Sequence, residues 1–174
     1  MGDVGEISAE SGMKLSIVIV HYNTPDLLRL CLTCIFSGSP DLSFEVIVID
    51  NASPDPEIRN LLHEFPQVQF EFNVENVGFA RGCNQGIRMA EGDYRMLLNP
   101  DALIDGDGIL GMVAFMEAHP KAGVAAPRLV NEDGTLQHSC RRDPSVRAAL
   151  LRGLRLEGLF PHPVRRYLMQ DWDH

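Results

Sequence analysis

Residues 15–36 read LSIVIVHYNTPDLLRLCLTCIF, and this stretch decides the fold. Its first six residues form a continuous apolar and largely β-branched run, which is typical of a strand covered on both faces. A helix is predicted to follow, with Thr24 as its N-cap and Pro25 at its first position. A buried strand that leads directly into an amphipathic helix is the repeating unit of α/β proteins.

The same unit recurs along the chain. Apolar runs of strand length follow at 44–49, 68–72, 94–98 and, more briefly, 124–126. Helical patterns lie between or after them, at 53–65, from the glycine-rich segment to Met89, and at 108–118. Ser53 is the expected N-cap of the second helix, with Pro54 at its first position. This alternation predicts right-handed crossovers and a mostly parallel sheet.

The composition predicts a globular domain with a sizeable core, because 45% of the 174 residues are hydrophobic. No apolar run approaches the roughly 20 residues that span a bilayer, and no signal peptide is recognisable, so we expect a cytoplasmic protein. Residues 1–13 are small and polar and are predicted to be a mobile lead-in. The net charge of −9 argues against nucleic acid as a partner.

Four cysteines are present, at positions 31, 34, 83 and 140. The first two form a CxxC pair, but no second pair and no nearby histidine completes a zinc site. We therefore expect all four to behave as small buried hydrophobic residues.

Polar residues follow each of the first four predicted strands. The four sets are His21 to Asn23, Asp50 to Ser53, Asn76 to Gly86, and Asn99 to Asp101. Carboxyl ends of parallel strands share one edge of the sheet, and ligands bind at that edge where the strand order switches. Ordinary turn and helix-cap roles explain any one of these polar sets. They explain four such sets at one edge less well.

The sequence motifs limit which kinds of ligand site can lie at this edge of the sheet. GxxxxGK[ST] is absent, so a P-loop is excluded. GxGxxG occurs only at 106–111, well after the strand predicted at 94–98 and not directly behind it, so a dinucleotide oxidoreductase is disfavoured. Gly78, Gly82 and Gly86 recur every four residues, which places them on one helix face that can pack closely on the sheet. Asp101 is the carboxylate that can hold a Mg²⁺ or Mn²⁺ ion bridging two phosphates.

Several of these stretches together resemble a known family. IVIVHYN, VIVIDNAS, NVENVGFARGCNQGI and LLNPDA are similar, in order and spacing, to family 2 glycosyltransferases with the GT-A fold, a three-layer α/β sandwich. GVAAPRLVNEDGTLQHSCRRDPS resembles the next stretch of the bacterial rhamnosyltransferase-type branch, which builds cell-surface polysaccharide. The resemblance covers about residues 14–145. It implies a GT-A nucleotide-sugar-binding domain over 14–143.

The resemblance implies roles for particular residues. It implies nucleotide binding by His21, Tyr22, Asn23, Asp50, Asn51, Ser53, Asn76, Gly78, Phe79, Arg81, Asn84 and Asn99. Asp50 would contact the base, and Asp101 would be the ligand of Mg²⁺ or Mn²⁺. Asn99 stands where the family has the first acidic residue of its DxD motif. We therefore expect poor metal affinity in the absence of a bound nucleotide.

The implied reaction is metal-dependent glycosyl transfer with inversion, from dTDP-rhamnose or a UDP-sugar to a glycan or a polyprenyl-linked acceptor. We assign no catalytic base, because Asp105 and Asp107 are near the metal residue but nothing gives either that role. In the branch an acceptor-binding half follows, so we expect this chain to be a truncated donor-binding half. A nucleotide-sugar-binding module without turnover is the alternative. A nucleotidyltransferase is weaker, because HYNTPD lacks a glycine-rich loop with a following basic residue.

The C-terminal end is basic. Residues 128–174 carry 8 Arg against 6 Asp and Glu, whereas residues 1–127 carry 7 Lys and Arg against 18 Asp and Glu. Residues 144–174 mix Leu with Arg at roughly helical spacing. This tail is predicted either to pack on an acceptor half or to contact anionic lipid at the inner face of the cell membrane. Exposed by truncation, it would also favour self-association.

Overall fold

The computed structural model describes residues 13–38, 42–131 and 133–137, together with isolated positions between 139 and 154. The chain divides into two compact units, residues 1–123 and 124–174. Residues 1–12 of the predicted lead-in, Cys140 and nearly all of the basic tail lie outside the described residues. The predicted domain boundary at residue 143 therefore stays a prediction.

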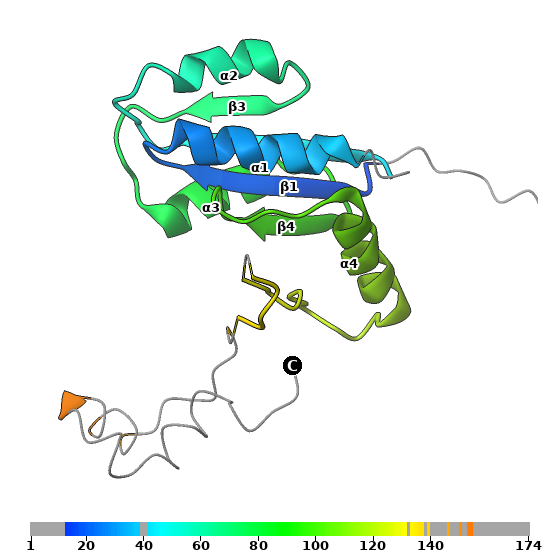
Figure 1. Ribbon diagram of the computed structural model, residues 1–174. Coiled ribbons are helices and arrows are strands. Elements are labelled where there is room, and N and C mark those ends of the chain that lie inside the picture. The colour runs from blue at the N-terminus through cyan, green and yellow to red at the C-terminus, as the bar shows by residue number, and fades with distance from the viewer. Residues whose placement is uncertain are drawn as a thin grey trace, which may run out of the picture. The chain divides into compact units, whose positions relative to one another are not determined.

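The first unit alternates strands and helices as predicted (Figure 1). The elements are β1 (Leu15–His21), α1 (Pro25–Ser37), β2 (Phe44–Asp50), α2 (Ile58–Glu64), β3 (Gln69–Phe72), α3 (Phe79–Met89), β4 (Tyr94–Leu98) and α4 (Gly106–Ala118). The described strands form a sheet of order β3-β2-β1-β4, in which every neighbouring pair is parallel. The chain moves outward from β1 to β3 and then returns to the other side of β1. The strand order therefore switches between β1 and β4, and the predicted parallel α/β architecture is confirmed.

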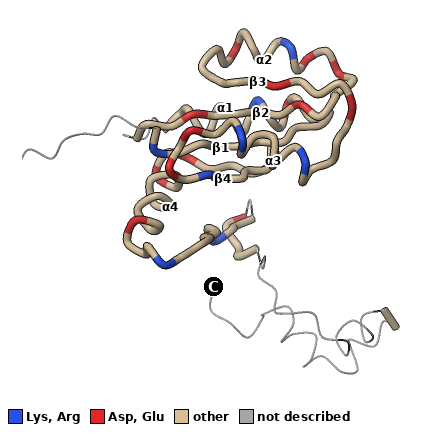
Figure 2. The backbone as a smooth tube through the Cα atoms, turned by 180° about the vertical axis from the view of Figure 1, so that it is seen from behind, with Lys and Arg blue, Asp and Glu red and all other residues tan. Residues whose placement is uncertain are grey.

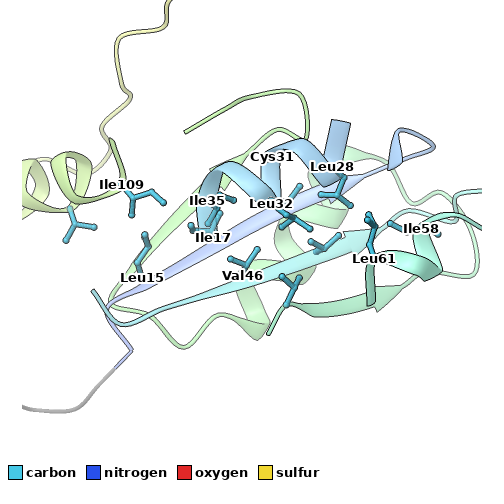
Figure 3. Close-up of a cluster of buried hydrophobic side chains, with 14 residues drawn as sticks. Leu15, Ile17, Leu28, Cys31, Leu32, Ile35, Val46, Ile58, Leu61 and Ile109 are labelled. Atoms are coloured by element: carbon cyan, nitrogen blue, oxygen red, sulfur yellow. The ribbon is translucent and has the colours of Figure 1, made fainter. Parts of the chain in front are cut away.

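Apolar residues on alternate strand positions build a core on each face of the sheet. On one face, side chains of β1 and β2 pack with those of α1, α2 and α4, and α1 contacts both other helices. Figure 3 labels ten members of this cluster: Leu15, Ile17, Leu28, Cys31, Leu32, Ile35, Val46, Ile58, Leu61 and Ile109. On the other face α3 covers β1 and β2, and Figure 1 shows it behind the sheet. The result is a helix–sheet–helix sandwich.

Two glycines bring α3 close to the sheet. A Cβ on Gly82 would lie 2.9 Å from the Val20 side chain, and a Cβ on Gly86 would overlap the Val18 side chain. Gly78 differs, because nothing lies within 4 Å of its Cβ position and its φ is +84°. The packing role is therefore confirmed for Gly82 and Gly86. Gly78 is instead needed for the left-handed backbone at the N-cap of α3.

Substituting Gly86→Ala is expected to lower the free energy of unfolding by about 1–3 kcal/mol, because the new methyl group would push against Val18. The contact is with a side chain, so Val18→Ala should relieve it. Urea unfolding of both single variants and the double variant measures the coupling. We expect the double variant to be at least about 1 kcal/mol more stable than the sum of the single effects predicts. Additive effects would contradict the close approach.

Thr24 is the N-cap of α1 and Pro25 begins the helix, as predicted, although the Thr24 side chain makes no capping bond. Two other local expectations are wrong. Ser53 does not cap the second helix and Pro54 does not begin it, because the helix begins at Ile58 and the Ser53 hydroxyl group bonds to Asp50. No strand forms over 124–126. Each of these segments has residue types that favour the predicted element, but the presence or absence of tertiary contacts decides whether that element forms.

The described part of the second unit contains a tight antiparallel turn. Val130 pairs with Leu136 in an isolated bridge, and Gly134 between them has a φ of +79°. Thr135 donates to Asp133 through both its backbone N–H and its hydroxyl group, which lowers the pKa of that carboxyl group.

Among helices in the described residues, none has the length and apolar character that crossing a bilayer requires. Figure 2 shows acidic and basic positions spread over the described elements.

Candidate active site

The predicted site lies at the carboxyl edge of the sheet, where the order switches between β1 and β4. Ile19 pairs with Leu98, the last residue of β4, and β1 continues to His21, so the loops after the two strands lie at the same edge of the sheet. The structure divides the predicted residues into two groups. The exposed group is Tyr22, Asn23, Asn76, Gly78, Phe79, Arg81, Asn84, Asn99 and Asp101. His21, Asp50 and Asn51 are buried, and Ser53 is half-buried. The second group therefore supports the loops on which the first group lies.

Asp50, at the end of β2, is bonded on both carboxylate oxygens. Its Oδ1 atom accepts from Nδ1 of His21 at 2.9 Å and from the Ser53 hydroxyl group at 2.5 Å. Its Oδ2 atom accepts from the Ser53 backbone N–H at 3.1 Å. Burial raises the pKa of Asp50, but the hydrogen bonds from His21 and Ser53 outweigh it and hold the pKa below the usual value. The carboxylate is therefore a stable buried anion.

His21 connects this carboxylate to the start of α1. Its Nε2 atom accepts a hydrogen bond from the Thr24 backbone N–H at 3.0 Å. A backbone N–H can only donate, so Nε2 carries no proton and Nδ1–H donates to Asp50. His21 is thus a neutral imidazole of fixed tautomer. It takes the place of the expected Thr24 side-chain cap by binding an amide at the first turn of the helix.

His21, Asp50 and Ser53, which we call the Asp50 cluster, hold the loop after β1 in an unusual backbone conformation. Asn23 has a φ of 55°, and its N–H donates to the Ser53 hydroxyl oxygen at 2.8 Å. Ala52, next to Ser53, also has a positive φ of 64°, which is strained for a residue with a Cβ. Tyr22, which precedes Asn23, is 51% exposed. The Asp50 cluster therefore sets the position of an exposed aromatic ring and an exposed amide.

Asn51 supports the loop on the other side. Its Nδ2 atom donates to Oδ1 of Asn76 at 2.9 Å, and its Oδ1 atom accepts from the Val77 N–H at 3.0 Å. Asn73 also donates to that oxygen, at 3.2 Å. Asn73 was not among the residues predicted from the sequence, although an amide just after a strand is a recognisable signal. The adjacent residues Asp50 and Asn51 thus anchor the loop after β1 and the loop between β3 and α3.

Asp101 follows β4 and is exposed. Within the described residues its carboxylate makes no hydrogen bond and no ion pair.

The nearby Cys31 thiol has its pKa raised to about 12, mainly by burial and in part by the charges of Cys34 and Asp101. Cys31 and Cys83 are buried, as predicted, and Cys34 is half-buried. A thiol of this kind is an inert core group.

The residues at this edge of the sheet can bind a divalent cation only together with other ligands, such as phosphate oxygens and water. The described residues contain no group of three His, Cys, Asp or Glu side chains that could hold a metal ion. Mg²⁺ and Mn²⁺ prefer oxygen ligands, and Mg²⁺ is commonly held by one or two carboxylates together with substrate phosphates and water. A single unpaired carboxylate at Asp101 fits that mode. The protein alone offers too few ligands for tight binding.

The pKa of Asp50 predicts how stability depends on pH. A lowered folded pKa means that the contribution of Asp50 is complete above about pH 4, the usual value, and disappears as the pH falls through the folded value. Asp50→Asn should therefore be less stable than the wild type at pH 7, with a gap that narrows below about pH 4. Urea unfolding at pH 7, 5, 4 and 3 would measure the gap. A gap independent of pH would show that the pKa of Asp50 is the same in the folded and the unfolded protein, which would contradict a lowered pKa.

Residues 16–166 match the family described as Glycosyl transferase family 2. The chain belongs to this family. Poly(ribitol-phosphate) beta-glucosyltransferase of Bacillus spizizenii is 30% identical over 109 residues, which are 59% of this chain and 17% of that protein. This chain covers between 10% and 32% of the length of eight curated relatives that it matches.

Solved structures show the same fold. TarS 1-349 of S. aureus matches with a TM-score of 0.55 and 20% identity, over 67% of this chain and 39% of that one. The mannosyltransferase PcManGT of Pyrobaculum calidifontis, solved with GDP-Man and Mn²⁺, matches with a TM-score of 0.52 and 25% identity. That match covers 59% of this chain and 32% of the mannosyltransferase. The expected GT-A fold is confirmed.

Proposed function

We propose that this family 2 chain binds the donor in a metal-dependent, inverting transfer of a sugar from a nucleotide diphosphate to a glycan or polyprenyl-linked acceptor. The observation that carries the proposal is the exposed Asp101 carboxylate, which has no protein partner among the described residues. It follows β4, directly beside the point where the strand order switches. In open α/β sheets ligands bind there.

Asp101 would hold Mg²⁺ or Mn²⁺ together with diphosphate oxygens and water. When bound, such an ion neutralises the negative charge that develops on the departing diphosphate. The structure of PcManGT with GDP-Man and Mn²⁺ and a structure of TarS with UDP support this pairing of nucleotide and fold. Since the proposal gives the metal a single protein carboxylate, Asp101, we expect the metal and the nucleotide to bind cooperatively.

The exposed residues would contact the nucleotide. Tyr22 and Phe79 are 51% and 57% exposed and offer aromatic faces for a base. Arg81, in the first turn of α3, offers a planar cation for phosphate oxygens. Asp50 contributes differently, because its oxygens already accept three protein hydrogen bonds. A direct contact of Asp50 with a base stays a prediction, and its bonds favour a positioning role.

The acceptor side is not assigned to any described residue. An inverting transfer needs a base that takes the proton of the attacking hydroxyl group. Asp105 is the N-cap of α4 and accepts from the Gly108 N–H at 2.8 Å, so its carboxylate already has a structural role. Asp107 is exposed in the first turn of the same helix. We propose a base from outside the described residues.

The donor sugar is proposed by resemblance alone, as dTDP-rhamnose or a UDP-sugar. One methyl group distinguishes the thymine base from uracil, which is worth too little to decide from these residues. A module that binds the nucleotide-sugar without turnover is the second candidate. Turnover, and not nucleotide binding, distinguishes the two candidates. The proposed contact of the basic tail with a membrane falls on residues that lie outside the described ranges.

Calorimetric titration of the purified chain with UDP and dTDP, each with Mn²⁺ and with EDTA, tests the proposal. We expect micromolar to millimolar affinity that Mn²⁺ improves, and the better nucleotide identifies the base. Release of the nucleotide diphosphate from the corresponding sugar donor, in the presence of acceptor, then separates a transferase from a binding module. Absence of binding to both nucleotides would contradict the proposal.

A further inference from the structure

Four side-chain amides form a continuous hydrogen-bonded row beneath the loop between β3 and α3. Nε2 of Gln85 donates to Oδ1 of Asn73 at 3.0 Å. Nδ2 of Asn73 donates to Oδ1 of Asn51 at 3.2 Å, and Nδ2 of Asn51 donates to Oδ1 of Asn76 at 2.9 Å. We call this row, Gln85–Asn73–Asn51–Asn76, the amide relay. Every donor in it points the same way, from α3 toward the exposed loop.

Backbone donors fix the direction of the relay. The oxygen and nitrogen of an amide side chain are otherwise assigned only by their partners. Here the Val77 N–H donates to Oδ1 of Asn51, and the Gly78 N–H donates to Oδ1 of Asn76, both at 3.0 Å. A backbone N–H cannot accept, so reversing either amide would place two donors against each other. The relay therefore has one polarity.

This polarity determines which group Asn76 offers to the outside. Its Oδ1 atom already accepts from Asn51 and Gly78. Its Nδ2 atom donates no hydrogen bond within the described residues, and Asn76 is exposed. Asn76 thus presents an NH₂ group outward at the carboxyl edge of the sheet. A group that only donates selects an oxygen acceptor and disfavours another donor.

We propose that Asn73 and Gln85 are positioning residues of the nucleotide site, which hold the NH₂ group of Asn76 outward as a donor to an oxygen acceptor. The inference rests on the proposed function. The ligand atom is an oxygen that carries no hydrogen, either a carbonyl oxygen of the base or a phosphate oxygen. Gln85 lies on α3, one residue before the Gly86 contact with the sheet, so close helix packing also places the first donor of the relay.

Two substitutions of Asn76 test the outward donor. Asn76→Asp keeps an oxygen for Asn51 and Gly78 and replaces the outward NH₂ group by oxygen. Asn76→Ser keeps an acceptor but is neutral. We expect UDP affinity with Mn²⁺ to fall about ten- to a hundredfold in the Asp variant and about tenfold in the Ser variant. Asn60→Asp, an exposed change on α2, controls for net charge and should bind UDP normally.

Unchanged thermal midpoints in both Asn76 variants would show that the fold is retained. If these variants bind UDP as tightly as the wild type does, the inference is overturned while the proposed function stands. If the wild type itself binds no nucleotide, the proposed function fails first. Uridine and inorganic pyrophosphate separate the two acceptors. A loss confined to uridine and UDP indicates a base carbonyl, and a loss confined to pyrophosphate and UDP indicates a phosphate oxygen.

Gln85→Met tests the positioning role, because it removes the first donor and roughly keeps the volume of the side chain. We expect UDP affinity to fall severalfold in the wild-type background and to stay unchanged in the Asn76→Ser background. That coupling distinguishes action through Asn76 from a general loss of structure. Equal losses in both backgrounds would overturn the positioning role of Gln85.

Discussion

Asp101→Asn is expected to abolish the increase in UDP or dTDP affinity that Mn²⁺ provides, on the order of a hundredfold, and to reduce any turnover at least as much. The substitution keeps the shape of the side chain and removes its charge. Asp101 is exposed and makes no hydrogen bond or ion pair within the described residues, so the fold should not need it. Calorimetric titration with Mn²⁺ and with EDTA measures the difference directly.

The matched control is Asp107→Asn, which removes the same charge from another exposed carboxylate a short distance along the chain. It should leave the effect of Mn²⁺ on nucleotide binding intact. Thermal midpoints of both variants should remain near the wild-type value. A full Mn²⁺ effect in Asp101→Asn would remove the metal-ligand assignment and leave the family relationship untouched.

Gly92→Ala is expected to destabilise the fold by about 3 kcal/mol or more, which is more than Gly86→Ala does. A Cβ at Gly92 would lie 2.6 Å from the Ser16 backbone nitrogen and 2.7 Å from the Leu15 carbonyl carbon. Both atoms belong to β1, the central strand, and backbone cannot turn aside as a side chain can. The Gly92 N–H also donates to the Ser16 hydroxyl group at 2.8 Å, and this bond would be strained.

Urea unfolding of Gly92→Ala measures the loss, with Gly111→Ala as the control. Gly111 lies inside α4 with nothing within 4 Å of its Cβ position. Alanine there should stabilise the protein by about 0.5–1 kcal/mol, because it favours the helix. Trimming Ser16 to alanine should not rescue Gly92→Ala, in contrast to the Val18 and Gly86 pair. A loss below about 1 kcal/mol in Gly92→Ala would show that β1 can shift.

The periodicity of the sequence determined the elements of the first unit. The β-branched runs at 15–20 and 44–49 favour strands covered on both faces, and those strands form the central pair of the sheet. Pro25 begins α1 as predicted, because proline suits the first helical turn wherever the helix lies. The carboxyl edge was predictable for the same reason. Once strands are parallel, their ends must coincide.

Contacts between distant residues decided what local patterns could not. Ser53 looks like a helix cap, yet its hydroxyl group donates to Asp50 and accepts from the Asn23 N–H, and α2 begins only at Ile58. Thr24 is capped through the ring of His21. No window of sequence contains such contacts, because they depend on which loops the sheet brings together.

The sequence by itself determined the parallel α/β class, the carboxyl edge and the residues that lie on it. Only the tertiary structure divided those residues into buried supports and exposed groups. Burial and hydrogen-bond partners are properties of the assembled loops, and residue type alone does not contain them. Asp50 and Asp101 are the same amino acid at two strand ends, but three protein donors surround one carboxylate and none of the described groups binds the other.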